Sequence, residues 1–487
     1  MDLGRMLEDV AGRFGDRTAF LYEDEQLSYE RLNRSVNAFA NYLKALGLGR
    51  GDHIAVMLGN CPEFVISYFA AQKIGAVAVT LNVLSTPYEL RHLLGNSDAK
   101  AFITSASSAK RYEEIQAEIP LCRQLILADG ESSSFKKALE EGPFTIDIPD
   151  IAPDDPAVMI YTAGLTGKPL GAVLTHNNLY TQSDLLRSIL HADENDRGLA
   201  LIPYFHSFGA VANMLSVIRS GASAVLMDRF TLDGIFGTVE KHQVTYIAAV
   251  PRLFLGMVFH ERKADYQFSR LRVCVTGGSA MPPDFIPLFE KEFRVKILEG
   301  YGLTEASPVS SFSRLDRPQK PGSIGIPIPG VEIRIVDEED REVPRGAVGE
   351  VAVRGENVMK GYYKDEAATA RVIRNGWLHS SDLGYMDEEG YIFLTGRKKR
   401  MIITSGFNVY PREVEIVLEM HPGVRSVRVE AKADLLRGEI VKAFVVKKND
   451  RAVDDRELTR HCRAYLSSYK VPREIEFVDR IEEDKQV

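Results

Sequence analysis

Apolar residues near the start of the chain follow a helical period. Leu3, Met6, Leu7, Val10 and Phe14 recur three or four positions apart on an acidic and basic background. This spacing predicts an amphipathic helix and differs from the continuous apolar core of a secretory signal.

Residues 86–104 show a helix–strand pattern that recurs along the chain. The sequence at 86–89 is a capping box with proline at the first helical position, so we expect a helix that runs to about residue 94 and ends at Gly95-Asn96. A short apolar strand follows at 101–104. Comparable runs recur at 123–128, 222–227, 244–249 and 271–276. Short apolar strands with helices between them are typical of parallel α/β sheets.

The pattern changes from about residue 322. Closely spaced strands such as 331–336 indicate an antiparallel or barrel-like subdomain over about 322–395. The basic run 397–400 precedes an α+β pattern with helices at 411–420 and 455–466 and strands at 424–429 and 440–446. We therefore predict an α/β fold with two parts, a large N-terminal domain at 1–397 and a small mobile domain at 398–487.

Composition narrows the class of protein. The 487 residues are 45% hydrophobic and 26% charged, with a net charge of −8, so a nucleic-acid partner is not expected. The most apolar stretch, 64–81, is interrupted by Gln72 and Lys73, so we expect no integral membrane span. The four cysteines form no CxxC pair, which favours a reducing, cytoplasmic location.

Segment 161–176 is rich in glycine and threonine and follows the apolar run 157–160. Backbone N–H groups and hydroxyls in such a turn suit phosphate oxygens, although the spacing is not that of a Walker A loop. Taken alone, a plain structural turn remains an equal alternative.

Segment 299–305 places Tyr301 between two glycines, followed by Thr304 and Glu305. The tyrosine ring can stack on a base, the glycines permit close approach of a flat ligand, and Glu305 offers an oxygen ligand to Mg²⁺. The alternative is a loop whose tyrosine packs on the core. Downstream, Asp382 could accept hydrogen bonds from ribose hydroxyls and Arg397 could hold ribose or phosphate, or both could be surface charges.

The order and wording of these segments resemble the adenylate-forming (ANL) superfamily of acyl-CoA synthetases, luciferases and peptide-synthetase adenylation domains. The resemblance runs from about residue 10 to the C-terminus. The phrases Pro-Tyr-Phe-His-Ser-Phe-Gly at 203–209 and Ser-Gly-Phe-Asn-Val-Tyr-Pro-Arg-Glu-Val-Glu at 405–415 are most similar to bacterial fatty acyl-CoA ligases.

The resemblance implies an enzyme that activates a carboxylic acid with ATP and Mg²⁺ as an acyl-adenylate and passes the acyl group to coenzyme A, with a small domain that rotates between the two steps. The residues it implies are the phosphate loop Thr162, Gly164, Thr166, Gly167 and Lys168; Tyr301, Gly302, Gly278 and Ser279 at adenine; Thr304 at the α-phosphate and Glu305 at the metal; Asp382 and Arg397 at ribose; Lys399 at the hinge; Ser405 and Gly406 at the pantetheine arm; and His206 near the acid.

This sequence departs from the family in two places. The family's phosphate loop usually reads Thr-Ser-Gly-Thr-Thr-Gly-x-Pro-Lys-Gly, whereas Ala163, Leu165 and Leu170 here replace two hydroxyls and a cation. The family's C-terminal catalytic lysine aligns just past Val487 without gaps, or with Lys485 if a short deletion is allowed. Both departures predict a slower adenylation step.

Three functions therefore stay open: an acyl-CoA ligase, an adenylating ligase that loads a carrier protein, and a nucleotide- or acyl-binding homologue with impaired catalysis. The candidate acid-pocket residues are apolar and favour a medium- or long-chain fatty acid: Phe205, Phe208, Gly209, Ala210, Met214, Gly277, Ala280, Ala306 and Pro308. The oligomeric state is not determined, and a homodimer stays open.

Overall fold

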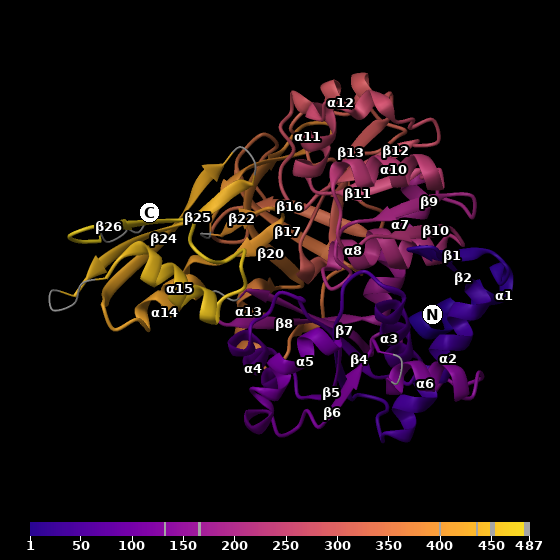
Figure 1. Cartoon of the computed structure of the whole chain (residues 1–487). Helices are drawn as coiled ribbons and strands as arrows, with labels where there is room; N and C mark the ends of the chain where they lie inside the picture. The colour runs from indigo at the N-terminus through magenta and orange to yellow at the C-terminus, as the bar shows by residue number, and fades with distance from the viewer. Residues whose placement is uncertain (131–132, 164–166, 399–400, 435–436, 449–452, 482–487) are drawn as a thin grey trace.

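The computed structural model describes residues 1–487 apart from 131–132, 164–166, 399–400, 435–436, 449–452 and 482–487. Figure 1 shows two large sheets with their helices on the right and a smaller C-terminal unit on the left. A strand-rich region joins the two parts.

The first large sheet has seven strands, and its middle strands are parallel. Its strands β3, β4 and β5 are short, apolar and almost wholly buried, as expected for a sheet covered on both faces. β7 and β8 form an antiparallel hairpin at one side. In spatial order the strands are β18 (Gly361–Tyr362), β8 (Pro169–Thr175), β7 (Pro156–Ala163), β4 (Val77–Thr80), β3 (His53–Met57), β5 (Ala99–Thr104) and β6 (Gln124–Leu127).

The second large sheet has nine strands, parallel in the middle and antiparallel at both ends. In spatial order they are β15 (Ile326–Pro327), β14 (Val309–Phe312), β13 (Lys296–Gly302), β12 (Val273–Thr276), β11 (Tyr246–Ala249), β9 (Arg197–Ala200), β10 (Ser223–Leu226), β1 (Thr18–Tyr22) and β2 (Glu25–Ser28).

Helices cover the faces of these two sheets (Figure 1). α3 is apolar around most of its circumference and is buried along almost its whole length, because it packs against α1 and α2. The helices before the C-terminal unit are α1 (Leu3–Phe14), α2 (Tyr29–Ala45), α3 (Pro62–Lys73), α4 (Pro87–Asn96), α5 (Ala106–Glu113), α6 (Ser134–Glu141), α7 (His176–Leu190), α8 (Ser207–Ala210), α9 (Ser216–Arg219), α10 (Leu232–His242), α11 (Pro251–Phe259), α12 (Phe285–Phe293) and α13 (Glu366–Val372). A π-helical turn, η2 (Val211–Leu215), joins α8 to α9.

Two further sheets follow. The strand-rich region is an antiparallel sheet of β16 (Val331–Val336), β17 (Gly349–Gly355), β19 (Ile373–Arg374), β20 (Trp377–Met386) and β21 (Ile392–Arg397). The C-terminal unit packs helices α14 (Pro411–Glu419) and α15 (Asp455–Tyr465) with a sheet of β22 (Ile402–Thr404), β23 (Phe407–Val409), β24 (Val424–Asp434), β25 (Gly438–Lys447) and β26 (Glu474–Phe477).

The predicted α/β fold is confirmed, with its parallel sheets, large N-terminal part and small C-terminal unit. The region predicted as antiparallel or barrel-like is an antiparallel sheet. The capping box at α4 is present, with Glu89 N donating to Thr86 Oγ1 at 3.3 Å and Thr86 N donating to Glu89 Oε2 at 2.8 Å. The domain boundary between 397 and 398 stays a prediction, and it falls between β21 and β22. Among the described residues, no helix is both long and apolar enough to cross a membrane.

Candidate active site

A cavity of about 660 Å³ lies where the edges of the large sheets, the strand-rich region and the C-terminal unit meet. Segment 299–305 forms one wall, and residues 378–382 in the first half of β20 form another. The C-terminal unit contributes Asn408, Tyr410 and Glu439 to the lining. The cavity is therefore assembled from segments that are far apart in sequence.

Glu305 stands in a short turn, η4 (Thr304–Ala306), directly after β13. Its Oε1 accepts hydrogen bonds from Thr162 Oγ1 at 3.0 Å and from Tyr362 OH at 2.8 Å. The described part of the chain offers no hydrogen-bond donor to Oε2. One fixed carboxylate with an oxygen facing the cavity fits Mg²⁺, which usually takes one or two protein carboxylates and completes its shell with phosphate and water.

A second cluster joins β13 to β20. Tyr301 OH donates to Asp382 Oδ2 at 2.6 Å, and Arg397 Nε donates to Asp382 Oδ1 at 3.1 Å. Burial, followed by the charge of Asp382, raises the pKa of Tyr301 well above its usual value, so the phenol stays protonated and keeps donating. Asp382 N in turn donates to Ser380 Oγ at 3.0 Å. The tyrosine and the carboxylate are thus oriented before any ligand arrives.

The two glycines beside Tyr301 are required by the protein's own packing. A Cβ on Gly302 would lie 1.7 Å from the carbonyl oxygen of Pro308, and one on Gly300 would lie 2.9 Å from the ring of Phe312. The sequence interpretation, close approach of a flat ligand, is therefore not needed to explain these glycines.

Charge around the cavity is largely paired. Lys398 Nζ lies 3.1 Å from Glu350 Oε2, and His379 contacts the same carboxylate. Burial raises the pKa of Glu350, but hydrogen bonds from His379 and Lys398 outweigh it and lower the pKa to about 2. Glu299 is buried in the cavity wall, and the described residues give it no ion pair. Burial raises its pKa to about 7.

The described end of the phosphate loop is apolar where it lines the cavity. Leu170 lines the cavity and pairs across the β7–β8 hairpin with Thr162. Lys168 is exposed and lies outside the lining, so it does not replace the missing lysine in this structure. Gly167 faces the C-terminal unit instead, because a Cβ there would lie 2.6 Å from Ile416 Cδ1.

His206 lies beside the cavity rather than in its lining. Its Nδ1 accepts the Phe208 N–H at 3.2 Å, and the neighbouring Ser207 Oγ lies 3.3 Å from Thr304 Oγ1. Burial lowers the pKa of His206 to about 4, so the ring is neutral at pH 7 and carries its proton on Nε2.

Ser405 and Gly406 form the two-residue turn of the β22–β23 hairpin, with φ of 54° and 86°. Both central residues have positive φ, which is the geometry that matches the twist of paired strands. The turn touches the start of α11, since Arg252 Nη1 donates to Ser405 Oγ at 3.0 Å and a Cβ on Gly406 would lie 2.8 Å from Val250 Cγ1.

Of the predicted site residues that the structure describes, most line one cavity and the others lie beside it. Those in the lining are Thr162, Gly278, Ser279, Tyr301, Gly302, Thr304, Glu305, Asp382 and Arg397. Gly164, Thr166, Lys399 and Lys485, with the variant position Leu165, lie outside the described residues. Of the predicted acid-pocket residues, Ala280 lines the cavity, whereas Phe205, Ala210, Met214 and Ala306 are buried in the core.

Sequence reasoning missed Tyr362 and Tyr410. Tyr362 belongs to a two-residue strand and has no periodic neighbours, so it carried no signal before the β8–β18 pairing was known. Tyr410 was quoted only as part of a phrase, and its place in the cavity depends on how the C-terminal unit sits.

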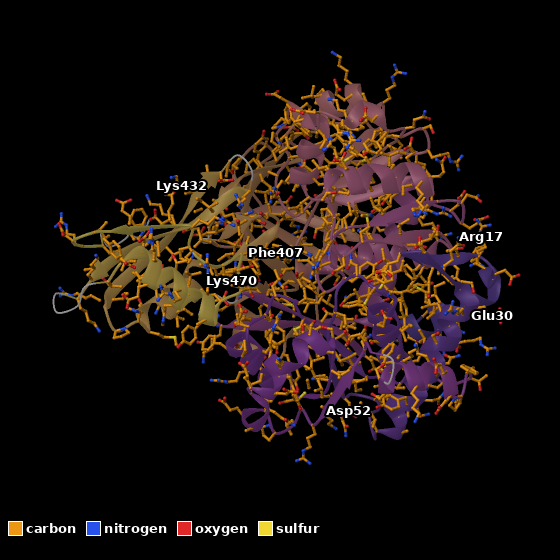
Figure 2. All side chains as sticks on the ribbon, in the orientation of Figure 1. Arg17, Glu30, Asp52, Phe407, Lys432 and Lys470 are labelled. Atoms are coloured by element: carbon orange, nitrogen blue, oxygen red, sulfur yellow. The ribbon has the colours of Figure 1, made fainter. Side chains whose placement is uncertain are left out.

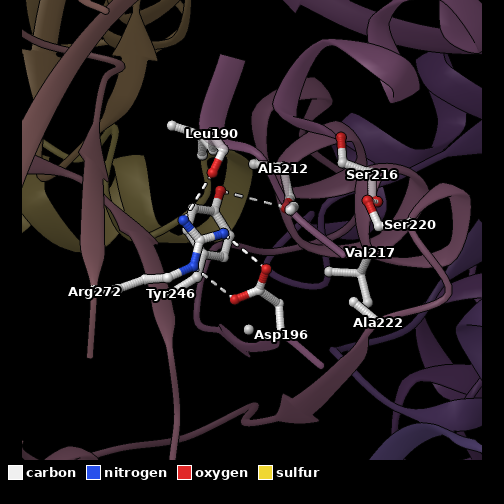
Figure 3. A pocket seen from close by; sticks show the side chains of 11 residues that line it. Leu190, Asp196, Ala212, Ser216, Val217, Ser220, Ala222, Tyr246 and Arg272 are labelled. Atoms are coloured by element: carbon white, nitrogen blue, oxygen red, sulfur yellow. Dashed lines mark hydrogen bonds and ion pairs between the residues drawn. The ribbon is translucent and has the colours of Figure 1, made fainter. Parts of the chain in front are cut away.

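A smaller cavity lies between α7, α9 and the face of the nine-stranded sheet (Figure 3). Arg272 Nη2 and Asp196 Oδ2 form an ion pair of 2.7 Å at one side, and Tyr246 OH donates to the carbonyl of Ala212 at 3.4 Å. A buried apolar layer that includes Ala248, Val275 and the partly buried Phe208 lies beside it on the same sheet.

The family model for AMP-binding enzymes matches residues 7–363, and the model for the C-terminal domain of AMP-binding enzymes matches residues 413–486. This chain belongs to the AMP-binding enzyme family. The long-chain-fatty-acid–CoA ligase of Bacillus subtilis is 35% identical to this chain over an alignment of 507 positions. The alignment covers 98% of this chain and 90% of that protein.

Solved structures of the family superpose over nearly the whole chain. An o-succinylbenzoate CoA synthetase double mutant from Bacillus subtilis, bound to a product analogue, gives a TM-score of 0.88 at 28% identity over 100% of this chain and 97% of that one. ATP-bound MatB from Rhodopseudomonas palustris gives a TM-score of 0.77 at 27% identity over 100% and 96%.

Proposed function

We propose that this chain is an AMP-forming acyl-CoA ligase that activates a medium- or long-chain fatty acid. The observation that carries the proposal is the pair of pre-oriented carboxylates, Glu305 and Asp382, in the lining of one cavity to which the C-terminal unit contributes. The relatives named long-chain-fatty-acid–CoA ligase support the class of substrate.

The first step joins acid and nucleotide. A carboxylate oxygen of the acid attacks the α-phosphorus of ATP, and the bond to pyrophosphate breaks. Asp382 would accept from the ribose hydroxyls with Arg397 beside it, and Thr304 would donate to the α-phosphate. Mg²⁺ held by Glu305 would neutralise charge on the leaving pyrophosphate. The chain's task is to position two anions, and no nucleophilic side chain is needed.

The second step transfers the acyl group. The sulfur of CoA attacks the carbonyl carbon of the adenylate, AMP leaves with the bonding electrons, and the thiol proton is lost to solvent. The turn at Ser405 and Gly406 would meet the pantetheine arm beside His206. The contact of this turn with the start of α11 supports assigning the present domain arrangement to this step.

The acyl tail would lie on the apolar face of the nine-stranded sheet, beneath α8 and η2. The buried layer there leads toward the small cavity of Figure 3, whose Asp196–Arg272 ion pair would stop an apolar chain from extending further.

The predicted domain boundary at 397/398 and hinge at Lys399 are part of the same proposal. Lys398 is held by the strand-rich region, because its N–H donates to the carbonyl of Ser381 at 2.8 Å and its ammonium contacts Glu350. Rotation after this anchor would move the C-terminal unit as one body. The four free cysteines support a reducing cytoplasm.

One observation favours a second candidate, an impaired homologue that binds nucleotide or acyl-adenylate. Leu170 contributes an apolar side chain to the lining of the cavity, at the end that would face the phosphates. Such a chain would bind AMP and still release no pyrophosphate.

The test is pyrophosphate release and acyl-CoA formation with ATP, Mg²⁺, CoA and a ladder of acids from acetate to palmitate. A chain-length optimum, with turnover lost in Glu305→Ala, is the expected result. Best turnover with short dicarboxylates would overturn the acid assignment. Binding of AMP without turnover would favour the impaired homologue, and acyl transfer to added carrier protein but not to CoA would favour the carrier-loading alternative.

A further inference from the structure

A buried ion triad joins the C-terminal unit to the rest of the chain. Lys470 Nζ lies 2.7 Å from Glu89 Oε1 and 2.6 Å from Glu413 Oε1. The side chains are 10%, 6% and 8% exposed, respectively. Figure 2 labels Lys470 and Phe407 at the junction of the two parts. Glu89 belongs to the first turn of α4, whereas Lys470 and Glu413 both belong to the C-terminal unit.

Hydrogen bonds surround the triad on both sides of the junction. Ser467 Oγ donates to Glu89 Oε2 at 2.6 Å, and Thr86 Oγ1 donates to the carbonyl of Tyr465 at 2.7 Å. Glu89 also caps α4 through the N–H of Thr86. The carboxylate of Glu89 is therefore fixed by its own helix before the C-terminal unit docks.

The triad is asymmetric in a way that suits a movable contact. A buried charge that loses its partner is strongly unfavourable. When the C-terminal unit moves away, Lys470 keeps Glu413, and Glu89 keeps its place at the helix cap, so neither charge is left buried and alone. Burial raises the pKa of Glu413, and the described residues give its Oε2 no partner. Glu89 is thus the member that completes the site only when the two parts are docked.

We propose that Glu89 and Lys470 form a latch that positions the C-terminal unit for acyl transfer to CoA. This inference rests on the proposed ligase function. The latch acts through other residues, because docking brings Asn408 and Tyr410 into the cavity lining and places the Ser405–Gly406 turn against α11. Its members are positioning residues, which favour one domain arrangement over the other.

The two half-reactions separate this role from a merely structural one. Adenylation is measured as pyrophosphate release without CoA, and transfer is measured by mixing preformed acyl-adenylate with CoA. In Lys470→Met, we expect transfer to fall roughly 5- to 150-fold, the usual range for coupling between states. The rate of adenylation in this variant should stay unchanged or increase.

Lys73→Met is the matched control. Lys73 is a second buried lysine, with a side chain that is 0% exposed, and it pairs with the partly exposed Glu8 at 3.1 Å. Both residues lie within the N-terminal part. Its loss should lower stability and both half-reactions alike. Glu89→Gln is the second variant, since a glutamine can keep the helix-cap contact while removing the charge that faces Lys470. It should reproduce the selective loss of transfer in a weaker form.

Hydrogen exchange gives a readout that does not depend on turnover. The backbone amides of residues 84–90 and 465–470 should exchange faster in Glu89→Gln and Lys470→Met than in the parent. Their exchange rates should be unchanged in Lys73→Met. Unchanged protection at this junction, or an unchanged ratio of the two half-reactions, would overturn the latch. Absence of both half-reactions in the parent would refute the ligase function and, with it, the role of the latch in acyl transfer. Faster exchange in the variants would then show only that Glu89 and Lys470 hold the two parts together.

Discussion

Replacing Leu170 by lysine would return a cation to the phosphate end of the cavity. Residues that pair directly across a hairpin present their side chains on the same face of the sheet. Leu170 pairs with Thr162, and Thr162 Oγ1 donates to Glu305 at 3.0 Å. Both paired side chains line the cavity. A lysine at 170 would therefore project toward the place where pyrophosphate leaves.

The size of the effect follows from the bond that would be gained. A hydrogen bond to a charged group is worth about 1.5–3 kcal/mol. If that bond is stronger in the transition state than in the ground state, it corresponds to a gain of roughly 10- to 150-fold in kcat/KM for ATP. The gain should be confined to adenylation, because acyl transfer from a preformed adenylate involves no pyrophosphate.

The assay is pyrophosphate release at varied ATP for the parent, Leu170→Lys and Leu170→Met. Methionine keeps the apolar character and nearly the volume of leucine, so it controls for packing. A gain in the lysine variant alone is the expected result. The reasoning fails if the lysine variant adenylates no faster than the methionine variant, or if both half-reactions speed up equally.

Three further outcomes follow from the same geometry. Asp382→Ala removes the acceptor of Tyr301 and Arg397, so kcat/KM for ATP should fall roughly 10- to 100-fold in initial-rate assays, and an unchanged value would place ribose elsewhere. Ala212→Leu fills the small cavity of Figure 3 and should move the optimum of the acid ladder to shorter chains, which a wrong tail path would leave unmoved. Glu299 has a pKa raised from 4.5 to about 7 by burial, so the native state holds a proton that the unfolded chain releases in that window, and its contribution to stability is lost as pH rises. The free energy of unfolding of Glu299→Gln, measured by thermal unfolding, should therefore rise relative to that of the parent by up to about 3 kcal/mol between pH 4.5 and 7. Parallel pH profiles for the two proteins would show that the pKa of Glu299 is not raised.

Local patterns in the sequence predicted the elements well, because their causes are local. The capping box at 86–89 and the period of residues 3–14 depend on neighbours within four positions. Strands of the parallel sheets were visible as short apolar runs because both faces are buried. Segment 299–305 was predictable as a candidate site for the same reason, since its tyrosine, threonine and glutamate lie within one loop, and it lines the cavity.

Contacts across the chain were not predictable in this way. Tyr362 donates to Glu305 from a strand 57 residues away, and Lys470 contacts Glu89 across 381 residues. Glu89 was read only as a capping residue, and that role is confirmed. The structure adds a second role for the same carboxylate, because its other contacts arise only when the C-terminal unit docks.

The glycines of segment 299–305 show why a motif can predict a site for an incomplete reason. Their spacing around Tyr301 was interpreted as room for a flat ligand, yet the close neighbours of Gly300 and Gly302 are Phe312 and Pro308 of the chain itself. Since these contacts fix the backbone on both sides of the tyrosine, the ring is directed at Asp382 without a ligand. The same constraint sets the direction in which the chain enters η4 and so presents Glu305 to Thr162 and Tyr362. Packing of segment 299–305 therefore pre-organises the proposed adenine, ribose and metal contacts together. The residues that differ from the family pattern lie instead in the phosphate loop, outside this segment.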